Sequence, residues 1–145
     1  MAAPDPEPLL GTNRFRVVIG ERELGFGEVG PLTSTTDVTT PAEERRHRLE
    51  TVVLRRALSR STELYDWRKR IADGLDDRRT VVIQQLGADG AVVNAWRLDR
   101  AWPCRWTGPA FNAAGNDLAI EELELVFEEL AWLDERESRN ETEGA

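Results

Sequence analysis

The chain has 145 residues, of which 40% are hydrophobic and 32% charged, a composition typical of one globular domain that is long enough to bury a core. Its 27 acidic and 19 basic residues leave a net charge of −8, which argues against nucleic-acid binding because that binding depends on neutralising phosphates. The single cysteine, Cys104, excludes an internal disulfide bond and a cysteine-based metal cluster.

The two ends of the sequence differ in composition from the middle. Residues 1–12 alternate prolines with acids and alanines, and we expect a disordered or extended N-terminal arm there. They lack the basic and apolar regions of a secretory signal, and no apolar run approaches the roughly 18 residues of a membrane-spanning helix. Residues 134–145 predict a polar C-terminal tail, so the expected folded domain spans residues 13–133. We expect it to be made and folded in a reducing cytoplasm, with later release by another route left open.

The first predicted element is a hairpin. Residues 13–19 alternate polar and apolar side chains and are rich in β-branched residues, which predicts a strand. Gly20 and Glu21 predict a turn, and residues 24–29 predict the return strand.

A glycine motif, G-x-G-x-x-G, runs from Gly25 to Gly30 within this return strand. In dinucleotide-binding proteins such glycines open a helix at the pyrophosphate. Here Pro31 and the segment TSTTDVTT follow, and these favour loop or extended structure. We therefore interpret the motif as a glycine-rich strand with close neighbours or a bulge.

A long polar loop follows, over residues 32–44, and a loop of this length in a compact domain usually has a function or an interaction. His47 comes next. Because it has no second histidine, cysteine or acid-base set in its pattern, we interpret it as a surface residue.

A strand and a helix occupy the middle of the chain. Residues 48–58 predict the strand. Ser59 or Ser61 is expected to cap the N-terminus of the helix, and Gly74 to follow its C-terminus. Three apolar side chains fall on one helical stripe that we expect to pack on a sheet: Leu64, Trp67 and Ile71.

Residues 78–86 predict a strand, residues 87–90 a hairpin turn, and residues 91–98 a return strand that continues to residue 105. Pro103 must lie at an edge or a bulge of that strand. Gly108-Pro109 is expected to break the chain, and residues 113–116 are expected to form a turn. Trp96, Trp102 and Trp106 are interpreted as core and strand-corner packing, with a carbohydrate or ligand platform of exposed rings as the alternative. Cys104 is interpreted as a small buried hydrophobe.

Residues 117–133 are ambiguous. Their apolar residues lie at helical spacing and glutamate favours helix, so the local pattern predicts a helix. A strand is also possible if a bulge at Glu121 and Glu122 brings the apolar side chains onto one face.

Together these segments resemble the tail-tube protein family of contractile phage tails and phage-like contractile injection systems, which is similar to the haemolysin-coregulated protein. The matching blocks are NRFRVVIG, GFGEVGPL, VVLRRALSRSTELYDWR, RRTVVIQQL, AVVNAWRLDRAWPCRWTGP and NAAGNDLAIEELELVFEEL. The most specific are the last two in this order, with a W-P-x-x-W corner, a Gly-Pro break and a G-N-x-x-A-I-E-x-L-E-L segment.

The resemblance implies a mainly β fold, a β-barrel or sandwich of two antiparallel sheets with one packed α-helix. It also implies that residues 117–133 form a strand, which overrides the local helix prediction. The implied function is that of a structural subunit of the inner tube, forming stacked hexameric rings inside a sheath. The implied partners are further copies of the chain, sheath protein, baseplate or spike proteins and tail-cap proteins, with cargo or DNA only in the lumen and no membrane insertion. The implied location is the cytoplasm during assembly and then a virion tail or injection particle.

The sequence departs from the family pattern in two places. Residues 33–48 are polar and lack glycine where the family usually has an aromatic, glycine-rich loop with a Pro-Gly step. Arg56-Ala57 stands where the family tends to have Arg-Gly. These differences leave open a paralogue that begins the tube at the baseplate.

A monomeric ligand-binding β-barrel is a further alternative. We expect no enzyme activity, no catalytic residues, no metal site and no cofactor, because no nucleophile-base pattern or metal-ligand spacing is present.

Two surface hypotheses follow from the resemblance. Residues 32–47 are the candidate for contact between rings. Five acids are expected on a solvated strand face, with some of them lining the lumen as the sharper hypothesis: Glu121, Glu122, Glu124, Glu128 and Glu129.

Overall fold

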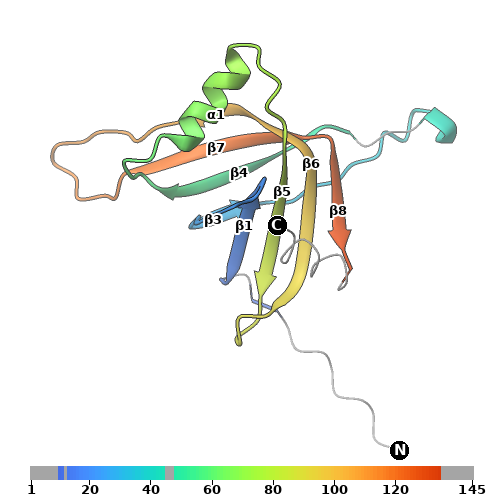
Figure 1. Ribbon diagram of the computed structural model, residues 1–145, viewed down its shortest axis with the longest axis horizontal. Coiled ribbons are helices and arrows are strands. Elements are labelled where there is room, and N and C mark those ends of the chain that lie inside the picture. The colour runs from blue at the N-terminus through green and yellow to red at the C-terminus, as the bar shows by residue number, and fades with distance from the viewer. Residues whose placement is uncertain (1–9, 12, 45–47, 135–145) are drawn as a thin grey trace, which may run out of the picture.

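The computed structural model describes residues 10–11, 13–44 and 48–134. Its strands form two antiparallel sheets that share one strand, β6, and a single helix packs against them (Figure 1). Sheet A has the order β2-β1-β5-β6-β8 and sheet B the order β3-β4-β7-β6. The mainly β fold with one packed helix is therefore confirmed. The elements are β1 (Phe15–Ile19), β2 (Arg22–Leu24), β3 (Glu28–Gly30), η1 (Ala42–Glu44), β4 (Glu50–Ala57), α1 (Glu63–Ala72), β5 (Arg79–Leu86), β6 (Val92–Thr107), β7 (Ile120–Phe127) and β8 (Glu129–Leu133).

Strand β6 passes from one sheet into the other. Its first part pairs with β5 on one side and β8 on the other, whereas its last part pairs with β7. The backbone of Arg100 has a φ of 49°, and the register with β7 shifts between Pro103 and Arg105. Pro103 therefore lies at a bulge, as the sequence predicted, because a proline cannot donate a ladder hydrogen bond.

The main core lies between the inner faces of the two sheets, and α1 covers one end of it (Figure 1). The predicted helical stripe is confirmed, because Leu64 and Trp67 are buried and Ile71 packs against the same cluster. The indole Nε1 of Trp67 donates to the carbonyl oxygen of Asp77 at 2.7 Å, so its polar atom is satisfied.

The helix begins one residue later than the latest start that the sequence predicted. Thr62, rather than Ser59 or Ser61, occupies the N-cap, and its hydroxyl donates to the Asp66 carboxylate at 2.8 Å. Gly74 does follow the helix, with a φ of 87°, and its N–H donates to the carbonyl oxygen of Ile71 at 3.1 Å. A left-handed conformation at this position is the reason for glycine.

The predicted return strand over residues 24–29 is wrong as one element. Strand β2 pairs with β1 and ends at Leu24. The chain then crosses to sheet B, where its next strand, β3, pairs with β4. The partly buried side chains of Phe26 and Val29 pack against the core during this crossing. Local alternation does not reveal such a change of sheet, because both halves read as extended chain.

The C-terminal segment is two strands, so the helix expected from its local pattern is wrong and the strand implied by the family is correct. The bulge expected at Glu121 and Glu122 is absent, because β4 and β7 keep one register along their whole pairing. The interruption lies at Glu128 instead, whose N–H donates to the carbonyl oxygen of Asp99 at 3.0 Å. Pairing of β7 with β4 and β6, and of β8 with β6, thus outweighs the helical propensity of the glutamates.

The predicted N-terminal arm and C-terminal tail fall almost wholly outside the described residues, as does His47. No helix among the described residues is long and apolar enough to cross a membrane.

Candidate interaction surfaces

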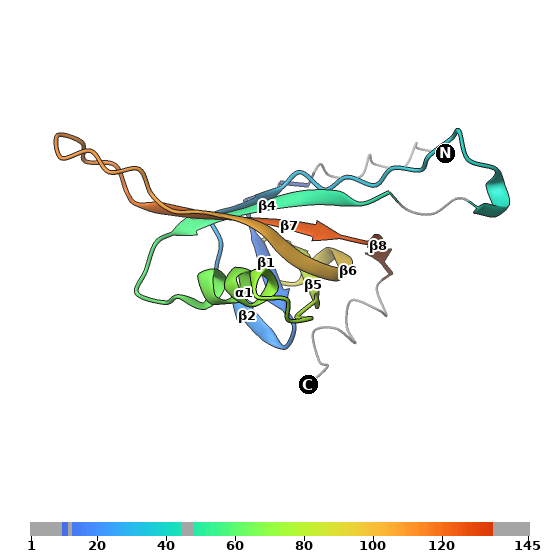
Figure 2. The ribbon, with the colours of Figure 1, turned by 90° about the horizontal axis from the view of Figure 1, so that it is seen from above.

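Two long connections project from opposite ends of sheet B (Figures 1 and 2). One is the 108–119 arm, which joins β6 to β7. The other is the 31–49 segment between β3 and β4, of which residues 45–47 are not described. Both carry apolar side chains in solvent: Phe111 is 90% exposed and Leu118 73% on the arm, and Val38 is 77% exposed on the segment. Single exposed apolar side chains are normal on a protein surface, so it is their place on projecting chain that makes these two connections candidate contact surfaces.

The base of the 108–119 arm is held by a buried carboxylate. Glu121, just after the arm, is only 2% exposed and accepts a hydrogen bond from the indole Nε1 of Trp106, just before it, at 2.9 Å. Arg56 of β4 donates from Nε to the same carboxylate at 2.7 Å and from Nη1 to Glu63 of α1 at 3.1 Å. Arg22 of β2 also contacts Glu63, with 3.0 Å between nitrogen and oxygen. The charge-assisted network ties both ends of the arm to the helix and to both sheets.

Trp106 also fixes the direction in which the arm leaves the body. Its ring meets Tyr65 of α1 edge to face, with 5.2 Å between ring centroids. A Cβ atom at Gly108 would lie 2.8 Å from the Trp106 ring, closer than real Cβ contacts. A larger residue at this position would therefore force the Trp106 ring to shift, so glycine suits the place where the chain passes over the ring.

The sequence pointed only indirectly to this arm. It marked Gly108-Pro109 as a break and residues 113–116 as a turn, and a turn does close there, with the N–H of Gly115 donating to the carbonyl oxygen of Asn112 at 3.0 Å. Phe111 was not identified as functional. Its signal was a lone aromatic residue between a Gly-Pro break and a Gly-Asn turn, where no strand or helix would bury it.

The five acids do not share one solvated face. Glu121 points into the core beside Leu123, which corrects the expectation for that residue. Glu122 and Glu124 lie on the opposite face of β7 and are half-buried, with Arg55 paired to Glu122 and Arg105 opposite Glu124. This alternation of sides follows from the unbroken strand register.

Glu128 and Glu129 lie at the junction of β7 and β8 and are half-buried. Glu128 pairs with Arg100 and with Nη1 of Arg78, the latter at 3.1 Å. The hydrogen bond from Arg100 lowers the pKa of the Glu128 carboxyl, so this acid stays charged. It links β6, through Arg100, to the chain just before β5, through Arg78.

The three tryptophans singled out by the sequence are each half-buried. Trp106 packs at the edge of the core as described, and Trp96 lies against Trp132 of β8 with 5.2 Å between ring centroids. The fully buried tryptophan is Trp67 of the helix. Cys104 is also half-buried, and burial raises the pKa of its thiol, which keeps it protonated and unreactive.

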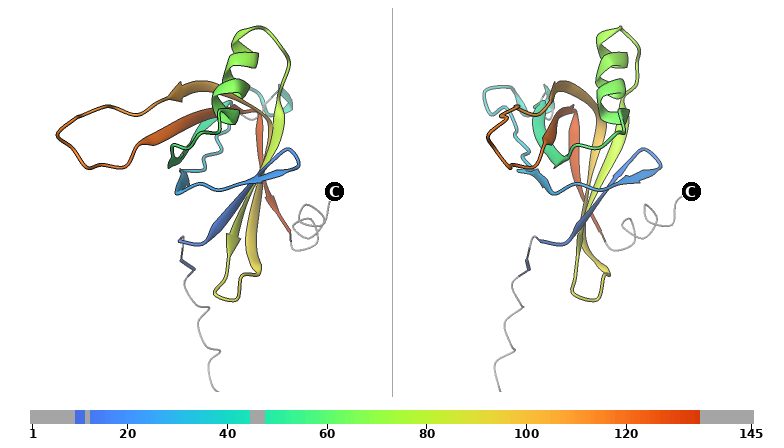
Figure 3. Two further views of the ribbon diagram at one scale, coloured as in Figure 1. Left: turned by 60° about the vertical axis from the view of Figure 1, so that its left-hand side comes forward. Right: turned by 90° about the vertical axis from the view of Figure 1, so that its left-hand side faces the viewer.

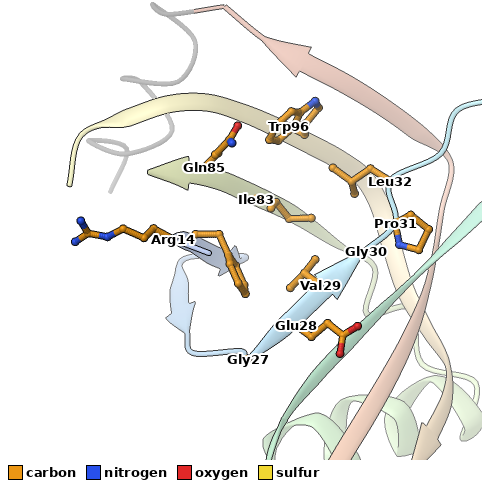
Figure 4. A pocket seen from close by; sticks show the side chains of 11 residues that line it. Arg14, Gly27, Glu28, Val29, Gly30, Pro31, Leu32, Ile83, Gln85 and Trp96 are labelled. Carbon is orange, nitrogen blue, oxygen red and sulfur yellow. The ribbon is translucent and has the colours of Figure 1, made fainter. Parts of the chain in front are cut away.

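An apolar cavity of about 430 Å³ opens beside β3 (Figure 4). The glycine motif forms one wall, and here the chain turns at Gly30, whose φ of 129° favours glycine. The motif ends in strand β3 and continues into the 31–49 segment, so no helix begins at its glycines. The lining residues are Arg14, Phe15, Gly27, Glu28, Val29, Gly30, Pro31, Leu32, Ile83, Gln85 and Trp96. Among the described residues, no group of three or more histidine, cysteine or acidic residues is placed to hold a metal ion.

Comparison with known proteins adds a family to this geometry. The family model described as T4-like virus tail tube protein gp19 matches residues 11–131. None of the curated protein sequences matches the chain significantly.

Solved structures share the fold. A chain from the sheath-tube complex of an extracellular contractile injection system, PVC, in its extended state superposes with a TM-score of 0.77 at 23% identity, covering 88% of this chain and 93% of that one. A chain from the tube-terminating cap of the anti-feeding prophage gives 0.76 at 17% identity, covering 91% and 95%. Hcp1 from Flavobacterium johnsoniae gives 0.57 at 14% identity, covering 81% and 93%.

Proposed function

The chain belongs to the T4-like virus tail tube protein gp19 family, and we propose from this that it is a structural subunit of the inner tube of a contractile tail or contractile injection system. The subunits assemble as stacked hexameric rings inside a sheath and carry cargo or DNA through the lumen. The match over residues 11–131 carries the proposal, and the likeness to a chain of the PVC sheath-tube complex supports it. Catalytic residues and cofactors have no part in it.

The sheet edges support ring formation. In the described part of the chain, β2, β3 and β8 each pair with one strand only. Unpaired edges are a liability in a free monomer, because they can pair with any other extended chain. In a closed ring the same edges can join neighbouring copies, which removes the liability and gives the assembly its symmetry.

The two projecting connections support stacking. The 108–119 arm and the 31–49 segment leave from opposite ends of the molecule, so one copy can contact a copy before it and a copy after it (Figure 2). Contacts of this head-to-tail kind propagate into rings and tubes rather than closed dimers. We propose residues 32–47 as a contact between rings.

The face of sheet B that carries Glu122 and Glu124 is the proposed lumen surface. Arg55 and Arg105 lie on the same face, so the acids are interleaved with cations. Such a surface is hydrated and has no extended apolar area on which a cargo chain would stick. A density map of the assembled tube that places these four side chains against the sheath would contradict this assignment.

A role at one end of the tube is the second candidate. The cap chain of the anti-feeding prophage superposes almost as well as the sheath-tube chain, which favours a terminator or a tube-initiating paralogue at the baseplate as an alternative role. The proposed partners of the main tube role are sheath, baseplate or spike, and tail-cap proteins. The proposed location is the cytoplasm during assembly and then a virion tail or phage-like particle.

Imaging of the purified full chain tests the proposal. We expect size-exclusion chromatography to show hexamers or larger species, and negative-stain micrographs to show six-fold rings that stack into tubes. Single rings that never stack would favour the cap or initiator role. A protein that remains monomeric at every concentration would contradict tube formation and favour a monomeric ligand-binding barrel.

A further inference from the structure

We propose that Phe111 of one copy inserts into the apolar cavity beside β3 of a second copy. The inference rests on the proposed function, because it names the residues of one contact between subunits. It joins two features that the fold leaves without a partner: an aromatic side chain on a projecting arm, and a cavity bounded by the glycine motif.

The arm is built to present its side chain. Its two ends are joined by the hydrogen bond between Trp106 and Glu121, and Gly108 fixes where it leaves the body. Phe111 nevertheless remains 90% exposed. An arm that is anchored at its base loses less conformational entropy on binding than a free loop, which favours a role in docking.

The cavity suits an aromatic side chain. Apolar side chains from β1, β3, β5 and β6, and one from the chain after β3, line it (Figure 4). They are Phe15, Val29, Ile83, Trp96 and Leu32. An apolar cavity of about 150 Å³ already accepts benzene, so 430 Å³ accommodates a phenyl ring together with part of a neighbouring side chain.

Charges at the two surfaces are compatible. Arg14 is exposed at the mouth of the cavity, and Asp117 is exposed on the returning half of the arm. Glu28, the acid that lines the cavity, has Arg55 as its own partner, at 3.6 Å between nitrogen and oxygen. Arg14 donates from Nη1 to the carbonyl oxygen of Ala88 at 2.7 Å but contacts no acid in the described part of the chain. Its charge is therefore open to an acid on the docking arm, and such complementarity favours specific association.

The contact must be between copies. The arm extends away from the body, whereas the cavity lies beside β1 and β3 (Figures 1 and 3). Arm and cavity are different surfaces of one chain, so a contact in which each copy's arm enters the cavity of the next copy is heterologous and propagates from copy to copy, as a ring or tube requires.

Cysteine cross-linking tests the contact directly. In the full chain with Cys104→Ser, the pair Phe111→Cys and Leu32→Cys should give a ladder of covalent multimers on mild oxidation, seen on a non-reducing gel and reversed by reductant. The control pair, Phe111→Cys with Leu75→Cys, places the second thiol on an exposed residue after helix α1, outside both proposed contact surfaces, and should give no ladder. Tubes or rings that form without the first ladder, or with a ladder only from the control pair, would overturn the inference and leave the tube proposal standing.

A second measurement covers the case in which the cysteine pairs assemble poorly. Phe111→Leu should assemble at a concentration within about threefold of the parent, whereas Phe111→Ser should need at least about tenfold more protein, because it removes a buried apolar anchor. Equal thresholds would overturn the inference. A parent chain that never assembles would overturn the tube proposal and this contact with it.

The dye 1-anilinonaphthalene-8-sulfonate separates a second copy from a small ligand as the occupant. We expect strong dye fluorescence from the unassembled Phe111→Ser chain and weak fluorescence from assembled parent protein. Equal dye binding by the two would show an open cavity in the assembly and would overturn the inference in favour of a small apolar ligand.

Discussion

Glu121 is the residue on which the geometry of the 108–119 arm depends. It is buried between the core and the base of the arm, and it accepts hydrogen bonds from Trp106 and Arg56. Arg56 is itself nearly buried, and its Nη2 has no hydrogen-bond partner within the described residues. If the Glu121 carboxylate is lost, the Nε of Arg56 also loses its hydrogen-bond partner. Of the three guanidinium nitrogens, only Nη1 then remains bonded within the described part of the chain, to Glu63.

Replacing this carboxylate is expected to cost more stability than its position on an acidic strand suggests. Glu121→Gln should lower the free energy of unfolding by about 3 kcal/mol, since it leaves the Arg56 charge buried without its main partner. Urea unfolding followed by circular dichroism measures the change. Glu122→Gln is the control on the opposite face, where the pair with Arg55 is more exposed and contributes about 0 to 1 kcal/mol. Equal losses for the two variants would show that the buried network does not contribute as argued.

Gly108 is the second residue with a strict requirement. Gly108→Ala places a Cβ atom against the Trp106 ring, so we expect a loss of about 1 to 3 kcal/mol and a change in tryptophan fluorescence as the ring shifts. Gly25→Ala is the matched control, because no heavy atom lies within 4 Å of the added Cβ. A neutral Gly108→Ala would mean that the ring moves aside at no cost.

At the scale of the elements, helix α1 is held to β5 by Asp77. Arg79 donates two hydrogen bonds to its carboxylate, at 3.0 and 2.8 Å, and Arg70 of the helix donates two more, at 2.9 and 2.6 Å. The hydrogen bond from Arg79, followed by that from Arg70, lowers the pKa of Asp77 below its ordinary value. The carboxylate therefore joins the end of the helix to the start of the next strand.

This lowered pKa makes a pH-dependent prediction. A carboxyl with a lower pKa in the folded state contributes stability above its unfolded pKa of about 4, and that contribution is lost as the pH falls through the folded value. Asp77→Asn should thus lower the free energy of unfolding by about 1 kcal/mol at pH 7 and by progressively less below pH 4. The control is Asp76→Asn, whose pair with Arg78 is exposed. A loss that stays constant down to low pH would show that the charge is not responsible.

The elements that could be predicted from the sequence are those whose pattern is local. The strand over residues 13–19, the hairpin at 87–90 and the stripe of α1 depend on neighbours within a few residues, and they were correct to within a few residues. The crossing from β2 to β3 and the strand β7 depend on pairing with β4, which lies far away in the sequence. Local propensity carries no information on such partners.

The candidate surfaces were predictable to a smaller extent. The polar loop predicted over residues 32–44, which forms most of the 31–49 segment, was identified because a long loop is unusual in a compact domain. The exposure of Phe111, the burial of Glu121 and the cavity wall at the glycine motif arise from side chains that only the folded chain brings together. Residue type alone predicts that an acid is solvated and an aromatic residue is buried. Glu121, which is buried, and Phe111, which is exposed, both reverse that rule.

At the scale of the whole molecule, the 31–49 segment tests stacking separately from folding. Deleting residues 34–40 removes mostly exposed chain. The contact between Thr39 and Asp37 and the hydrogen bond from the Arg48 N–H to the carbonyl oxygen of Thr35 are lost with it, but no residue of the core or of strands β1 to β8 is removed. We expect a chain with unchanged circular dichroism that forms no tubes in electron micrographs. A variant with residues 34–40 replaced by a glycine-serine linker of equal length shows whether length or side chains matter. Unaltered tubes from the deleted chain would remove this segment from the contact between rings.

The sharing of β6 by both sheets has a consequence for the order in which the chain folds. The hairpin of β5 and β6 closes through a short turn and needs no distant segment. Strand β1 must find β5, and β4 must find β7, across separations of 62 to 77 residues. Short-range pairings form before long-range ones, because less chain entropy is lost in closing the loop. We therefore expect β5 and β6 to act as the folding nucleus, with the other edge of β6 then pairing with β8 and, further along the strand, with β7. In pulsed hydrogen exchange the amides of this hairpin should be protected first, and the arm, which needs both β6 and β7, should acquire its fixed position only when folding is complete.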